Sequence, residues 1–69
     1  MARVIWDRPT YPGRYVSDSL GIERWQLKEA IHRIKASHAL RPTDRIIIYD
    51  NGDVADTAGD RIANIYDEI

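Results

Sequence analysis

The sequence predicts an α+β fold in which one principal helix packs on a small antiparallel sheet. Apolar residues recur at helical spacing over residues 23–38, and a β-branched run leads into Asn51-Gly52 before a returning segment. The chain has 69 residues, which is the length of one small domain. We therefore expect a single domain that comprises residues 1–69.

The N-terminal part, residues 1–19, is predicted to form a strand and an arm ahead of a helix and meander over residues 20–69. "ARVIWD" is rich in β-forming residues and predicts a short strand over residues 2–6. "RPTYPGRY" contains two prolines and a glycine, which predicts a loop or extended arm. "YVSDSLG" favours a short helix over residues 15–20, because glycine suits the left-handed position that follows a helix.

The main helix is predicted over residues 23–38. Its apolar stripe recurs at positions i, i+4, i+7 and i+11 and consists of Leu27, Ile31, Ile34 and His38. Arg41-Pro42 ends the helix, because proline disfavours helical dihedrals in the residue before it. We expect the stripe to face the sheet and the polar side of the helix to face solvent.

The rest of the chain is predicted to form a three-stranded antiparallel meander over residues 45–50, 53–57 and 61–66. "RIIIY" is a β-branched run, and Asn51-Gly52 is the preferred pair for a two-residue type I′ turn before "DVADT". The last segment, "RIANIY", fits a strand or a helix, because its isoleucines also match the helical period. We choose a strand, because the segment is short and the turn "AGD" precedes it.

Composition restricts the classes of protein that the sequence suits. The chain has no cysteine, which excludes disulfides and thiolate metal sites. Its two histidines and scattered carboxylates do not form a closed ligand set, so we expect neither a metal nor a cofactor. The sequence contains neither an apolar run of about 20 residues for a membrane span nor a secretory signal. We therefore expect a cytoplasmic protein with no membrane partner.

Charge is distributed unevenly along the chain. Residues 1–45 hold nine basic and five acidic residues, a net charge of +4, whereas residues 46–69 hold one basic and six acidic residues, a net charge of −5. A basic half suits contact with phosphate while an acidic half faces away. Charges that merely scatter over a small surface explain the same asymmetry.

The stretch "GIERWQLKEAIHRIK", residues 21–35, supports three functional hypotheses, of which the first is catalytic. His32 lies off the apolar stripe, and Lys28 and Lys35 are one turn away on either side. An imidazole can take the proton of a ribose 2′-hydroxyl, while cations stabilise the charge that builds on the phosphate. The plain alternative is a surface histidine among solvated lysines.

The second hypothesis is a helix-turn-helix that binds nucleic acid. Gly21 permits the tight turn, and apolar residues six, nine and ten positions beyond it fit the seating of a second helix on the first. The usual three-helix support is missing, because a β-hairpin follows. The residues predicted to face the nucleic acid are Arg24, Trp25, Lys28, Glu29, His32 and Lys35.

The third hypothesis is an interaction module. Two tryptophans and four tyrosines are a large aromatic content for this chain length. Trp25 lies off the main stripe, where an exposed indole would form a hot spot for a partner protein or a second copy of the chain. An open edge strand also permits pairing with another chain, so another protein or a second copy in a homodimer is the expected partner of this hypothesis, whereas RNA is the expected partner of the catalytic one. Alternatively, Trp25 closes the core against the N-terminal arm.

Two segments, "LGIERWQLKEAIHRIK" and "YDNGDVADTAGDRIANIYDEI", carry a family resemblance. Residues 20–69 resemble small C-terminal modules of bacterial polymorphic toxins of the Rhs and contact-dependent inhibition type. The resemblance implies a ribonuclease-like domain with a helix on a sheet. Ala63 departs from the pattern, which usually has glycine before the asparagine.

The resemblance also implies roles for individual polar residues. His32 would be the base, and Lys35 with Arg33 would bind phosphate. Asp53 and Asn64 would position the substrate. Each residue has a structural alternative: Asp53 brackets a turn, Asn64 bonds to backbone at a strand edge, and Lys35 is solvated. Metal-independent RNA cleavage is the function that the sequence favours.

Overall fold

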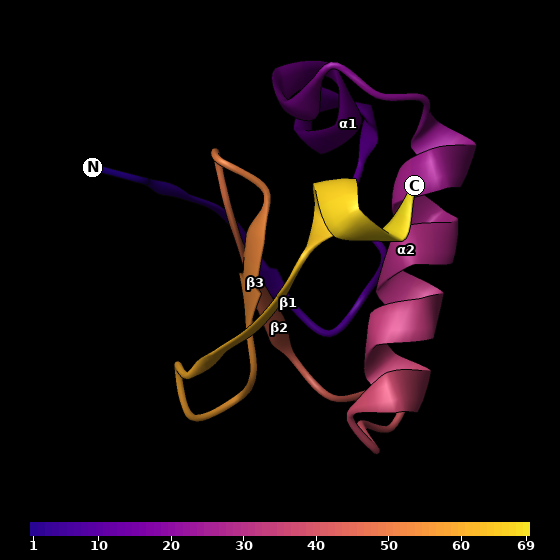
Figure 1. Cartoon of the computed structure of the whole chain (residues 1–69), viewed down its shortest axis with the longest axis vertical. Helices are drawn as coiled ribbons and strands as arrows, with labels where there is room; N and C mark the ends of the chain where they lie inside the picture. The colour runs from indigo at the N-terminus through magenta and orange to yellow at the C-terminus, as the bar shows by residue number, and fades with distance from the viewer.

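The computed structural model covers residues 1–69 and has two layers (Figure 1). One layer is a four-stranded antiparallel sheet with strand order β1-β2-β3-β4, and the helices lie on one face of it. The α+β prediction is confirmed. The elements in chain order are β1 (Val4–Arg8), α1 (Arg14–Leu20), α2 (Arg24–Ser37), β2 (Ile46–Tyr49), β3 (Asp53–Ala55), β4 (Arg61–Asn64) and the 3-10 helix η1 (Ile65–Glu68).

The N-terminal strand and the short first helix both form where the sequence predicts them, within two residues. β1 pairs with β2 and is one edge of the sheet, while β4 is the other edge. α1 ends at Gly21, which has a left-handed φ of 69° and whose N–H bonds to the carbonyl of Asp18. Glycine adopts this conformation without the strain of a side chain. Neither α1 nor α2 has the length and apolar character needed to cross a lipid bilayer.

The core lies between α2 and the sheet. The predicted stripe of α2 is buried except for His38, which is the exposed C-cap residue because the helix ends at Ser37. Each fully buried aliphatic side chain contributes about 1.5–3 kcal/mol relative to exposure. The cluster that fills the core consists of Val16, Leu20, Leu27, Ala30, Ile31, Ile34, Ile46, Ile48, Val54 and Ile65.

The β2–β3 hairpin is confirmed, but its turn is not the predicted type I′. That type needs a positive φ at both central residues, whereas Gly52 has a φ of 92° and Asn51 does not have a positive φ. The Gly52 N–H instead donates to the carbonyl of Tyr49 at 2.9 Å, and the Asp53 N–H donates to Asn51 Oδ1 at 3.0 Å. The loop therefore has three residues, 50–52, and ends in a left-handed glycine.

The last segment, predicted as a strand over residues 61–66, divides into β4 and η1. Asn64 ends the strand, because its side-chain oxygen accepts the N–H of Tyr66 at 2.9 Å and so caps η1. Ile65 then enters the core, and the Tyr66 hydroxyl donates to the carbonyl of Leu20 at 2.6 Å. The first part of this stretch therefore forms the predicted strand, and the part from Ile65 onward forms a helical turn.

Gly52 lies directly under the ring of Tyr66. A Cβ atom at position 52 would stand 2.7 Å from Cδ2 of that ring, which is closer than a normal contact. Because Tyr66 also bonds to α1, this contact joins the tip of the β2–β3 hairpin to η1 and α1. Gly59 has a similar φ of 87°, but nothing lies within 4 Å of its Cβ position.

We expect Gly52→Ala to lower the free energy of unfolding by about 2–5 kcal/mol, from left-handed strain plus overpacking against Tyr66. The matched control, Gly59→Ala, suffers the strain alone and should lose about 1–2 kcal/mol. Urea unfolding followed by circular dichroism measures both. Equal losses in the two variants would show that Tyr66 does not restrict position 52.

Candidate functional site

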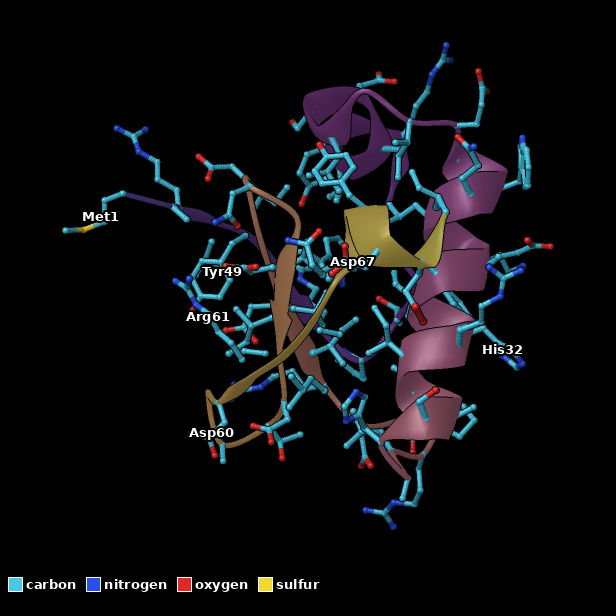
Figure 2. All side chains as sticks on the ribbon, in the orientation of Figure 1. Met1, His32, Tyr49, Asp60, Arg61 and Asp67 are labelled. Carbon is cyan, nitrogen blue, oxygen red and sulfur yellow. The ribbon has the colours of Figure 1, made fainter.

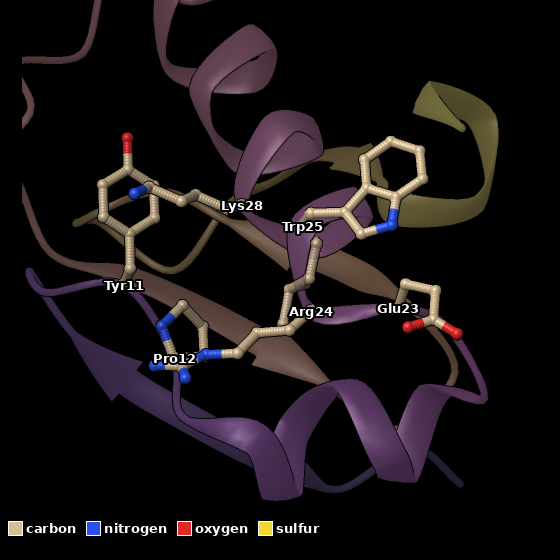
Figure 3. Close-up of a pocket in the computed structure, with 7 residues that line it drawn as sticks. Tyr11, Pro12, Glu23, Arg24, Trp25 and Lys28 are labelled. Carbon is tan, nitrogen blue, oxygen red and sulfur yellow. The ribbon is translucent and has the colours of Figure 1, made fainter.

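A groove runs along the outer side of the N-terminal half of α2, where the β1–α1 loop approaches the helix (Figure 3). It consists of two hollows of about 430 and 460 Å³ that share Tyr11, Trp25 and Lys28. We call the two hollows together the α2 groove. The first hollow is completed by Pro12, Glu23, Arg24 and Leu27, and the second by Glu29, His32 and Arg33.

Helical spacing brings most of these side chains together. Arg24, Lys28 and His32 are four residues apart, so they form one row along the helix surface. The helix begins with a capping box, in which the Glu23 N–H donates to the side-chain oxygen of Gln26 at 2.9 Å. This capping stabilises the first turn of α2, on which Arg24 lies.

Tyr11 is a groove residue that the sequence analysis does not place in the site. Its ring lies under the ammonium group of Lys28, with 5.3 Å from Nζ to the ring centroid. That is the geometry of a cation–π contact. Pro9 and Pro12 on either side restrict the loop backbone, and they are the one sequence signal for an ordered tyrosine here.

Positive charge is free at one end of the α2 groove and neutralised at the other. Neither Arg24 nor Lys28 has a carboxylate oxygen within 4.0 Å. Arg33 instead lies 3.6 Å from a carboxylate oxygen of Glu29, and its Nη1 donates to the carbonyl of Glu68 at 2.7 Å. Glu23 lines the same hollow but forms an ion pair with neither Arg24 nor Lys28, so these two cations can attract an anion.

His32 and Trp25 are both open to solvent. Figure 2 shows His32 on the outer side of α2, pointing away from the sheet. Its imidazole makes no hydrogen bond within the chain, so both ring nitrogens are free to meet a ligand. Trp25 is 61% exposed and lines both hollows, so it does not close the core against the N-terminal arm.

Lys35, the cation predicted to accompany His32, does not line the groove. It is only 6% exposed, and its Nζ donates to the carbonyls of Pro9 at 3.3 Å and Pro42 at 2.8 Å. Burial lowers the pKa of Lys35, and the nearby Asp44 carboxylate partly offsets that effect. Lys35 follows Ile31 by four residues, so helical geometry directs it toward the core side.

Neither Asp53 nor Asn64 lines one of the two hollows. Their side chains form a hydrogen bond with each other where β3 begins and β4 ends. Asn64 Nδ2 donates to one Asp53 oxygen at 2.9 Å, and Arg61 Nη1 donates to the other at 2.7 Å. The hydrogen bond from Asn64, then that from Asn51, and the Arg61 charge hold the pKa of Asp53 below its usual range. These side chains saturate the carboxylate within the chain.

The sheet face opposite the helices carries a second cluster. The Arg61 guanidinium lies 4.3 Å from the ring centroid of Tyr49 while it is paired with Asp53. Figure 2 shows Tyr49 and Arg61 on the other side of the molecule from His32. This cluster therefore cannot act together with the α2 groove on one small ligand.

No group of three or more histidine or acidic side chains is placed to hold a metal ion. Comparison with protein-family models, with curated proteins and with solved structures finds no match to this chain. The chemistry of the α2 groove therefore has to follow from its own side chains: an open imidazole, two unpaired cations and two accessible aromatic rings.

We expect Lys35→Ala to lower the free energy of unfolding by about 1–3 kcal/mol, because two carbonyl groups lose their donor. Lys28→Ala is the matched control, since Lys28 is exposed and loses only its contact with the Tyr11 ring, which should cost less than about 1 kcal/mol. Urea unfolding compares the two variants. A Lys35→Ala variant as stable as the wild type would contradict the structural role of Lys35.

The lowered pKa of Asp53 has a consequence for stability against pH. A carboxylate with a depressed pKa stabilises the fold above its unfolded pKa, and this contribution is lost as pH falls through its folded pKa. We expect Asp53→Asn to be less stable than the wild type at pH 7, with the difference shrinking in acid below the usual carboxyl range. Asp60→Asn, on a neighbouring exposed turn, is the control. A difference independent of pH would contradict this prediction.

Proposed function

We propose that the chain cleaves RNA at the α2 groove without a metal ion, and that His32 is the general base. One observation carries the proposal: an exposed imidazole shares one groove with Lys28 and with the rings of Tyr11 and Trp25. Cations attract phosphate, aromatic rings stack on bases, and an imidazole transfers protons near neutral pH. Together these groups suit a ribonucleotide.

The reaction needs only one base and one stabilising cation from the chain. His32 takes the proton from a ribose 2′-hydroxyl, and the 2′ oxygen forms a bond to the adjacent phosphorus. The bond from phosphorus to the 5′ oxygen breaks, and water protonates the departing oxygen. The products are a 2′,3′-cyclic phosphate and a 5′-hydroxyl end. The Lys28 ammonium group stabilises the negative charge that builds on the phosphorus oxygens.

In this proposal, Lys28 takes the phosphate-binding role that the sequence assigns to Lys35. Arg33 lies beside His32 in the second hollow and is oriented there by Glu29 and by the Glu68 carbonyl. Asp53 and Asn64 stabilise the end of the β3–β4 hairpin and do not contact the substrate. An RNA substrate also fits the expected cytoplasmic location.

A second candidate is a binding module without catalysis. The 61% exposure of Trp25 favours a partner surface, and the α1–Gly21–α2 arrangement resembles a helix-turn-helix whose second helix carries exposed cations. Self-association through Trp25, or through β1 or β4 as edge strands, belongs to the same alternative. A binding module would not depend on the proton-accepting nitrogen of His32.

We expect His32→Ala to reduce RNA cleavage by about 100-fold or more at neutral pH in the presence of a chelator, because the base is lost. The matched control is His38→Ala, since His38 is exposed but lies outside the groove. The assay follows a defined RNA oligonucleotide by gel, and circular dichroism checks that both variants fold. The proposal fails if the wild type does not cleave RNA, or if both variants cleave it at the same rate.

A further inference from the structure

We propose that the α2 groove selects single-stranded RNA, by stacking unpaired bases on Trp25 and Tyr11 and holding the phosphate between them on Arg24 and Lys28. This inference rests on the proposed function and names the class of RNA. Figure 3 shows Tyr11 and Trp25 on opposite sides of the first hollow, with Lys28 extending over the ring of Tyr11 and Arg24 extending toward Pro12.

Trp25 offers an open ring for stacking, and Tyr11 offers the exposed part of its ring beside the Lys28 ammonium group. Trp25 is 61% exposed and Tyr11 is 42% exposed, and both line both hollows. A base in a duplex has both faces covered by its neighbours, so it cannot stack on a protein ring unless it is first unstacked. An unpaired base has no such cost, and stacking on an aromatic side chain tolerates every base.

The cations are placed to hold the phosphate of the same segment. Arg24 and Lys28 are one helical turn apart, about 6 Å along the axis, and neither has a carboxylate partner. Lys28 Nζ already lies 5.3 Å from the Tyr11 ring centroid, so one nucleotide can contact both groups. Glu23 lines the first hollow too, but in Figure 3 it lies on the Trp25 side, away from Lys28.

The length of the row formed by Arg24, Lys28 and His32 limits the number of nucleotides that the groove can hold. From Arg24 to His32 the helix rises about 12 Å, which corresponds to about four stacked nucleotides at 3.4 Å each. His32 stands at one end of this row, beyond Lys28. We therefore place the scissile phosphate between Lys28 and His32, beside the stacked nucleotides, so cleavage occurs within or beside an unpaired run.

The test measures binding separately from cleavage. The probe is a labelled 2′-O-methyl RNA octamer, which cannot be cleaved because its 2′ oxygens are blocked, either single-stranded or in a duplex with its complement. Fluorescence anisotropy with the full chain should give at least about 10-fold tighter binding to the single strand. Trp25→Ala should lose about 10-fold or more of that affinity, while Trp25→Phe should keep most of it.

A matched pair of arginine variants tests the contribution of the cations to RNA binding. Arg24→Ala should weaken binding of the single strand and reduce its dependence on salt, whereas Arg3→Ala removes an exposed arginine that also lacks a carboxylate partner but lies outside the groove, and should change neither. Circular dichroism confirms that each variant folds. Arg24 and Arg3 variants that bind alike would overturn the assignment of phosphate to the groove.

The outcomes separate this inference from the proposed function. Trp25-dependent binding of the single strand without cleavage of unmodified RNA would overturn the cleavage proposal and support this one. Equal affinity for single strand and duplex, or binding that Trp25→Ala leaves unchanged, would overturn this inference even if His32 cleaves RNA. Failure to bind either form would overturn it as well, and would favour a protein partner at Trp25.

Discussion

The buried ammonium group of Lys35 holds two irregular segments of the chain against α2. Its two hydrogen bonds join α2 to the carbonyl of Pro9 in the arm and to that of Pro42 before β2. The arm carries Tyr11 only two residues beyond Pro9, so the position of one groove wall follows from this contact. Burying a charged group costs free energy unless the group is hydrogen-bonded. The two hydrogen bonds of Lys35 meet this need, and they also stabilise segments that lie outside the helices and strands.

The fold was predictable because its main elements carry their own periodicity. The α2 stripe is buried except for His38, β2 buries Ile46 and Ile48, and the β2–β3 hairpin forms where Asn51-Gly52 marks a turn. The turn type was not predictable, because the side chain of Asn51 bonds to the backbone of Asp53 and Tyr66 packs over Gly52. Those partners are defined only after the C-terminal segment has folded back.

The candidate site was predictable only where it depends on one helix. Lys28 and Trp25 lie off the apolar stripe, so their exposure beside His32 follows from helical spacing alone. Lys35 was placed beside His32, although its spacing of four residues from Ile31 directs it toward the core. The position of Tyr11 was not predictable, because it depends on a contact between α2 and a distant loop. Asp53 and Asn64 have the side chains of ligand-binding residues, yet in the structure they form a hydrogen bond with each other between β3 and β4.

The two hairpin tips differ in a way that bears on how the chain can vary in length. The β2–β3 tip is covered by Tyr66, so an inserted residue there would displace the aromatic ring and the end of α1 that it holds. The β3–β4 tip projects into solvent, and nothing surrounds Gly59. Related chains of different length, and engineered epitope grafts, are therefore best accommodated between Thr57 and Asp60, far from the helix that carries the groove.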